Sequence, residues 1–208
     1  MICSYLLSAF VTSKWVSDLQ VALFTMAGLL AIRSSRLRRG EVRLLVTAGF
    51  LTSLLVIVVA NHQGGSVGRG VASVWTGLLL LFIVVVIVRQ ILSAPAVTAQ
   101  SIYGAISAYL IIGLMFAAVY GAMYYFQGKT FFTGGQPGRA ANLQYFSFTT
   151  LTTLGYGDFT ARYNPGRAVA MLEAMTGQIF LATLVAKLVA SFRPAATRQR
   201  AGSAEHQD

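Results

Sequence analysis

Residues 152–158 of the chain read Thr152-Thr153-Leu154-Gly155-Tyr156-Gly157-Asp158. The two glycines stand at alternate positions, and a residue without a Cβ adopts backbone conformations that residues with a side chain rarely reach. A strand built in this way places successive carbonyl groups on one side, where stacked oxygens form a cation site. The stretch therefore predicts a short length of non-helical backbone that binds a cation.

The composition places this stretch in a membrane protein. Of the 208 residues, 56% are hydrophobic and 11% are charged, whereas soluble domains carry roughly 25% charged residues. Lys and Arg number 16 against 6 Asp and Glu, which gives a net charge of +10. These basic residues lie mostly between apolar runs, so we expect no nucleic-acid partner. The single cysteine, Cys3, excludes an internal disulfide framework.

Charge-poor stretches predict membrane-spanning helices at residues 15–32, 44–60, 71–88, 102–126 and 168–192. The first is the weakest, because Asp18 lies in its first turn. Arginines crowd residues 33–43, and short basic loops stay in the cytoplasm. This orientation places residues 127–167 outside and the C-terminal tail in the cytoplasm of a multi-pass protein of the cell membrane.

The outer segment between the last two spans is expected to re-enter the membrane. Asn142 is predicted to cap a short helix that ends near Thr152, and the glycine-containing strand follows it. Non-helical backbone at membrane depth is tolerated only where protein buries it or water fills a cavity. A half-helix followed by this strand meets that requirement.

At these residues the sequence resembles the potassium channels of the pore-loop superfamily, most nearly the prokaryotic one-filter type. Their filter signature matches residues 152–158, although Val or Ile usually stands where this chain has Leu154. The resemblance implies an all-α membrane protein with an outer helix, pore helix, filter and inner helix. We divide the chain into an N-terminal region with two or three membrane helices (1–101), a pore domain (102–192) and a disordered cytoplasmic tail (193–208).

The resemblance also implies how the filter binds its ion. K⁺ would be coordinated by backbone carbonyls and by one hydroxyl, that of Thr153, within the strand Thr153, Leu154, Gly155, Tyr156 and Gly157. Each chain has one such strand and four surround an ion, so a homotetramer is expected. The implied partners are K⁺, the bilayer and further copies of the chain, with no cofactor besides the permeant ion.

Three residues are expected to support the filter, namely Tyr145, Thr152 and Asp158. Tyr145 stands where the family often has Trp, and we expect it to hydrogen-bond Asp158. Thr149 stands where some relatives have a Glu partner for that Asp. Inactivation behaviour is therefore not carried over from the family.

The last span offers candidates for gating. Gly177 matches the hinge glycine of inner helices, although a glycine there equally suits close helix packing. An apolar row below it either lines the pore or faces lipid: Leu181, Val185 and Val189.

Two charged residues lie within the same span. Glu173 is a functional candidate because an ionised carboxylate at membrane depth costs about 2.5–3.5 kcal/mol. It is expected to bond a pore-helix hydroxyl such as Thr149 or Thr150, or else to reach the outer interface. Lys187 is expected to extend to the cytoplasmic face.

These features predict a K⁺-selective channel without a voltage sensor. Two alternatives remain open: a weakly selective cation channel, and a non-conducting scaffold or subunit that needs a partner chain. Enzymatic activity is not expected, because no carboxylate pair, His cluster or nucleophile with a base occurs in a shared segment.

The open probability is predicted to depend weakly on voltage. Moving one charge through the membrane field yields about 2.3 kcal/mol per 100 mV, and the five spans offer no regular array of such charges. Single-channel recording over a range of voltages checks this, and a steep sigmoid would contradict it.

Overall fold

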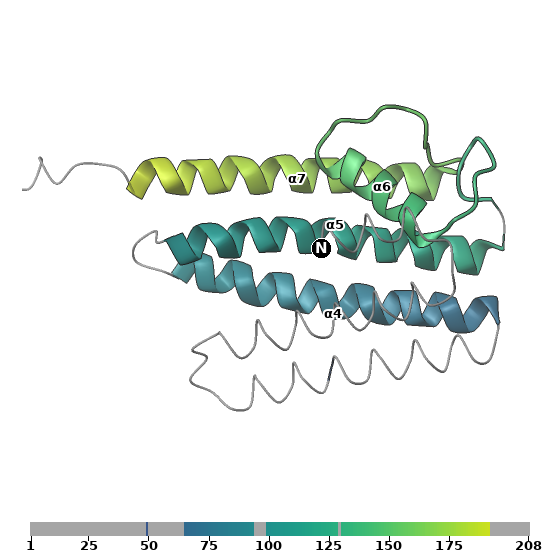
Figure 1. Ribbon diagram of the computed structural model, residues 1–208, viewed down its shortest axis with the longest axis horizontal. Coiled ribbons are helices and arrows are strands. Elements are labelled where there is room, and N and C mark those ends of the chain that lie inside the picture. The colour runs from purple at the N-terminus through teal and green to yellow at the C-terminus, as the bar shows by residue number, and fades with distance from the viewer. Residues whose placement is uncertain (1–48, 50–64, 94–98, 129, 192–208) are drawn as a thin grey trace, which may run out of the picture.

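The computed structural model describes residues 49, 65–93, 99–128 and 130–191. Residues 65–191 within this set form four helices: α4 (Ser66–Ser93), α5 (Ala99–Gln127), α6 (Ala140–Leu151) and α7 (Asn164–Ser191). None of these described residues belongs to a β-sheet, and "the strand" below means the non-helical segment at 152–158. Figure 1 shows the three long helices side by side and the short α6 at one end, in contact with α5 and α7. The predicted spans at 15–32 and 44–60, apart from Gly49, and the tail at 193–208 lie outside the described residues.

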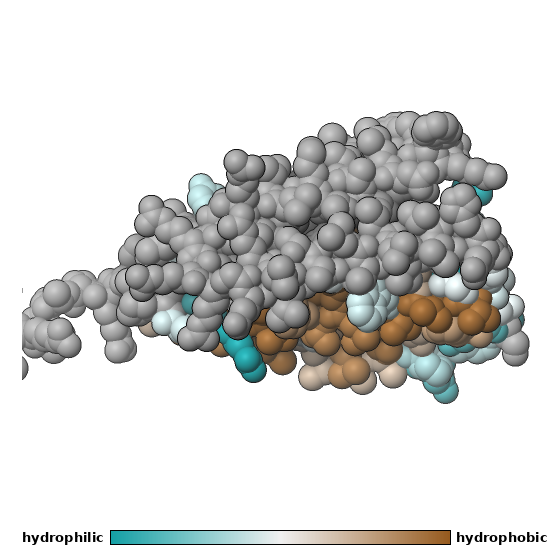
Figure 2. Space-filling model, turned by 90° about the horizontal axis from the view of Figure 1, so that it is seen from below, coloured by the Kyte–Doolittle hydropathy of each residue, from teal (hydrophilic) through white to brown (hydrophobic). Residues whose placement is uncertain are grey.

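Helices α4, α5 and α7 are long and apolar enough to cross a membrane. Helices α4 and α5 contain the predicted spans at 71–88 and 102–126. Helix α7 contains the predicted span at 168–192 except for its last residue. Figure 2 shows apolar residues over the middle of the coloured surface and hydrophilic residues toward either side. Large side chains such as Val67 and Leu78 of α4 are 64% and 57% exposed. An apolar band between polar ends is suited to contact with lipid.

Small residues bring α4 and α5 together. Gly70, Ala72 and Gly77 are buried on α4, and a Cβ added to Gly121 of α5 would lie 3.2 Å from the Ser73 hydroxyl oxygen. Without a hydrophobic driving force between helices in lipid, close backbone approach through small residues is the usual means of association. The two helices therefore form a packed hairpin.

A buried aromatic cluster anchors the outer end of α6. It contains Tyr120, Phe131, Phe132, Leu143, Phe146 and Ala161. An isolated antiparallel bridge joins Phe132 to Ala161, with the Thr133 N–H donating to Thr160 O at 2.9 Å. The chain entering α6 is thus paired with the chain that leaves the strand at 152–158.

The predicted cap of α6 is wrong. The helix begins at Ala140, and Arg139 stands at the N-cap without a side-chain cap bond. Asn142 lies inside the helix, where its Nδ2 donates to Pro137 O at 2.8 Å. Just before the helix, Gly138 packs against the Tyr124 ring, which an added Cβ would approach to 2.5 Å.

Candidate functional site

The strand after α6 has the alternating backbone that its glycines predict. The backbone angle φ is +57° at Thr153, +48° at Gly155 and +83° at Gly157, while Leu154 and Tyr156 do not share this left-handed conformation. Glycine adopts a positive φ without steric cost, but a β-branched residue rarely does. Alternation between left-handed and ordinary residues brings carbonyl groups toward a common side of the strand.

Thr153 is the strained member of this strand. A non-glycine residue with positive φ costs about 1–3 kcal/mol and persists only where its surroundings hold it. Its N–H donates to Thr150 O at 2.9 Å, and its hydroxyl donates to Thr152 O at 2.7 Å. The hydroxyl oxygen in turn accepts a bond of 3.2 Å from Nε2 of Gln178 on α7. Both the backbone and the side chain of Thr153 are therefore positioned.

Gln178 was not among the residues expected from the sequence. Gln178 lies 25 residues from its partner Thr153, so no local sequence pattern predicts this contact. One available signal is the amide itself, because a polar side chain in an apolar membrane helix usually finds a partner on another segment.

The strand also completes the hydrogen bonding of α6. The last four carbonyls of a helix have no partner within it. Here the Thr152 N–H donates to Phe148 O (3.1 Å), the Gly155 N–H to Thr149 O (3.0 Å) and the Thr153 N–H to Thr150 O (2.9 Å). The fourth carbonyl, that of Leu151, accepts a bond of 3.3 Å from the Tyr109 hydroxyl. The first residues of the strand are thereby fixed to the end of the helix.

Of the three residues expected to support the filter, Thr152 and Asp158 are the first and last of this segment and Tyr145 lies on α6. The Thr152 hydroxyl donates to Phe148 O at 2.7 Å, and the Tyr145 ring packs against Phe159 at a centroid distance of 5.4 Å. Asp158 is exposed, and its carbonyl accepts a bond of 3.0 Å from Gln136 Nε2. A hydrogen bond between Tyr145 and Asp158 remains a prediction.

Gly177 lies against the end of α6. A Cβ added at this position would stand 2.2 Å from the carbonyl oxygen of Leu151 and 3.0 Å from its Cδ1. The same carbonyl oxygen accepts the Tyr109 hydroxyl bond, which a shift away from Gly177 would disturb. This geometry favours the packing interpretation of the glycine over the hinge.

Glu173 is fully buried, with 0% of its surface exposed, so it does not reach the outer interface. Its Oε1 lies 2.5 Å from the Ser147 hydroxyl oxygen of α6, and the Tyr120 hydroxyl donates to its Oε2 at 2.6 Å. The pore-helix partner is thus Ser147. The Thr149 hydroxyl instead donates to Tyr145 O at 2.9 Å.

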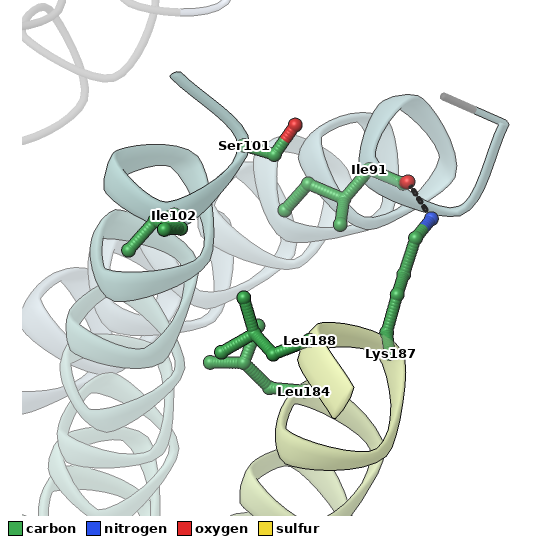
Figure 3. A pocket seen from close by; sticks show the side chains of 6 residues that line it. All are labelled: Ile91, Ser101, Ile102, Leu184, Lys187 and Leu188. Atoms are coloured by element: carbon green, nitrogen blue, oxygen red, sulfur yellow. Dashed lines mark hydrogen bonds between the residues drawn. The ribbon is translucent and has the colours of Figure 1, made fainter. Parts of the chain in front are cut away.

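Lys187 connects the opposite end of α7 to α4. Figure 3 shows its amine at the carbonyl of Ile91 in the last turns of α4, to which it donates a hydrogen bond. The surrounding pocket is lined by Ile91, Ser101, Ile102, Leu184 and Leu188. A cation near helix C-terminal carbonyls is favoured by the helix dipole. Lys187 therefore contacts the C-terminal turns of α4, and its extension to the cytoplasmic face remains a prediction.

The side chains of the apolar row on α7 are exposed in the single chain, by 38% at Leu181, 57% at Val185 and 65% at Val189. Exposure in one chain fits both interpretations, a pore lining and a lipid-facing stripe. Among the described residues, no group of three or more His, Cys, Asp or Glu side chains is placed to hold a metal ion.

Substituting Gly177 with alanine is predicted to destabilise the protein. The added methyl group overlaps the Leu151 carbonyl, and overpacking of this kind costs about 1–3 kcal/mol. Thermal unfolding of the purified protein should show a lower apparent Tm, with loss of assembled protein on a sizing column.

Gly77→Ala is the matched control for this change. Both substitutions gain about 1 kcal/mol of helix propensity, but a Cβ at Gly77 would have its nearest neighbour at 3.8 Å. The control should keep or raise the Tm. A raised Tm for Gly177→Ala as well would support the hinge interpretation instead.

The site lies within a recognisable family segment. Residues 107–193 match the family model described as ion channel, and this match covers less than half of the chain. No curated protein and no solved structure matches the chain in the corresponding comparisons. The matched segment contains α6, the strand at 152–158 and α7. Together with three apolar helices of membrane-spanning length, the match supports an ion channel of the pore-loop superfamily.

Proposed function

We propose that the chain forms a homotetrameric channel that conducts K⁺ selectively and passively across the cell membrane, without a voltage sensor. The observation that carries the proposal is the positive φ at Thr153, Gly155 and Gly157, directly after a short helix in a segment that matches ion channels. In this proposal α5 is the outer helix, α6 the re-entrant pore helix and α7 the inner helix. The C-terminus is cytoplasmic.

Selectivity is assigned to the backbone of residues 153–157. K⁺ and Na⁺ carry the same charge, so long-range attraction by Asp158 or by the C-terminal dipole of α6 does not separate them. Only the nearest ligands do. Carbonyl rings discriminate by cavity size or by the number and strength of their dipoles, and both accounts need the glycine-dependent strand. A 100-fold preference requires only about 2.7 kcal/mol, so a small distortion of the rings is enough to remove it.

The surface of the single chain supports a homotetramer. Leu154 and Tyr156 of the strand are 55% and 69% exposed. On α7, Met171, Met175 and Ile179 recur every four residues and are 62%, 53% and 62% exposed, which places them on one face. Closed four-fold assembly covers such a face with further copies of the chain and brings four strands around one axis. The strand then acquires the neighbours that a complete ion site requires.

Reconstituted wild-type protein is predicted to give currents that reverse close to the K⁺ equilibrium potential under opposed K⁺ and Na⁺ gradients. In Gly155→Ala, conduction or K⁺ preference should be lost, because a Cβ at φ +48° costs roughly 1–2 kcal/mol in each chain. Planar bilayer recording measures both quantities. Wild-type reversal near zero would favour the weakly selective alternative, and absence of current would favour the scaffold or subunit.

Gly128→Ala is the control for this substitution. Gly128 also has a positive φ, +59°, and like Gly155 it has no atom within 4 Å of an added Cβ. The two variants therefore carry similar backbone strain at different places. Gly128→Ala should keep the wild-type permeability ratio, and equal effects of both variants would show that strain alone is responsible.

Gln178→Leu is predicted to change K⁺ conductance through Thr153. The substitution removes the amide that donates to the Thr153 hydroxyl, and a single hydrogen bond contributes about 0.5–1.5 kcal/mol. A cycle with Thr153→Ala should give a coupling of about 2- to 10-fold in single-channel conductance. Independent effects of the two substitutions would contradict a direct role for this bond.

A further inference from the structure

A closed set of hydrogen bonds joins the three helices of the pore segment. Glu173 lies nine residues into α7, about 14 Å from its start. Its Oε2 accepts a bond of 2.6 Å from the Tyr120 hydroxyl of α5, and its Oε1 lies 2.5 Å from the Ser147 hydroxyl oxygen of α6. The same Ser147 oxygen lies 2.6 Å from the carbonyl oxygen of Gly113 on α5.

Counting protons decides the direction of these bonds. A serine hydroxyl has one hydrogen, and a backbone carbonyl only accepts. If Ser147 donates to Glu173, its oxygen and that of Gly113 face each other at 2.6 Å without a hydrogen between them, which is repulsive. If Ser147 donates to Gly113, the proton in the 2.5 Å contact must come from Glu173. Only the second arrangement makes every short contact a hydrogen bond.

The surroundings point to the same arrangement. The partners of the Glu173 carboxyl within the described residues are two hydroxyl groups, and neither is a cation. Helix α6, which supplies Ser147, has no acidic or basic residue. Both Glu173 and Ser147 are 0% exposed. An ionised carboxylate buried without a cation is costly, whereas a neutral acid whose donor and acceptor are both satisfied is not.

We infer that Glu173 is held as a neutral carboxylic acid, whose proton is donated to Ser147 and whose carbonyl oxygen accepts from Tyr120. Ser147 lies one turn before Leu151, the last residue of α6. Glu173 is therefore a positioning residue, which fixes the pore helix between α5 and α7 and with it the start of the strand. The inference does not depend on K⁺ selectivity, because it concerns only the packing of the three helices.

Infrared spectroscopy of the full chain in lipid vesicles at pH 6, where an ordinary glutamate is ionised, tests the protonation directly. The wild-type spectrum minus that of Glu173→Gln should contain the C=O stretch of a carboxylic acid, and the other acidic side chains cancel in the subtraction. Carboxylate bands in this difference would overturn the inference. The readout needs no conduction, so it remains valid even if the proposed channel function fails.

Tyr120→Phe and Ser147→Ala test the direction of the bonds. Removing the Tyr120 hydroxyl takes a donor from the acid's carbonyl oxygen, so the C=O band should move to higher frequency. Removing the Ser147 hydroxyl takes away the acceptor of the acid's proton, which should also shift the band. A band at the same frequency in both variants would overturn the assignment of partners.

Stability provides the second test. Gln donates from its amide to Ser147 and accepts from Tyr120, as the neutral acid does, so Glu173→Gln should keep the wild-type Tm. Glu173→Leu has similar volume but leaves both hydroxyls without their partner, so it should lower the Tm or prevent assembly. If Gln lowers the Tm as much as Leu does, the neutral hydrogen-bond set is not what holds the helices.

Discussion

The carbonyls at the C-terminal end of α6 constrain the rest of the site. The last four carbonyls of a helix have no partner within it, and a buried polar group left unpaired costs about 1–3 kcal/mol. Three of these carbonyls accept N–H groups from Thr152, Thr153 and Gly155, and the fourth accepts the Tyr109 hydroxyl. Satisfying the helix therefore dictates the path of the strand. The strained conformation of Thr153 occurs within this path, at the residue whose N–H donates to Thr150 O.

Much of this architecture could be predicted from short-range sequence features. Runs of apolar residues located the three described membrane-length helices, and the spacing of Gly155 and Gly157 predicted the left-handed residues of the strand. The positive φ of Thr153 could not be read in this way, because a β-branched residue does not signal it. Likewise, Asn142 is of a residue type that commonly caps helices, but α6 begins at Ala140, two residues before it.

Contacts between helices were the least accessible to sequence reasoning. The sequence indicates that Glu173 is an acidic residue within an apolar helix, where an ionised carboxylate is costly. It does not indicate the partners, because Tyr120 and Ser147 lie 53 and 26 residues away along the chain. Thr149 and Thr150 were equally good hydroxyl candidates until the rotation of α6 about its axis was known. The same limit applies to Gly177, for which hinge and packing have identical sequence signals and differ only in the distance to the Leu151 carbonyl.

The contacts that hold the end of α6 come from one short stretch of α7. Glu173 and Gly177 are four positions apart and share a face of the helix, and Gln178 directly follows Gly177. They contact, in order, Ser147 within α6, Leu151 at its end and Thr153 in the strand. These three contacts differ in kind: a buried hydrogen bond at Ser147, close packing of a glycine at Leu151 and an exposed hydrogen bond from an amide at Thr153. The glycine allows an approach to Leu151 that any residue with a Cβ would prevent. Helix α7 is therefore held against the end of α6 by close packing at Gly177, and the hydrogen bonds to Ser147 and Thr153 on either side of this contact fix its register against α6 and the strand.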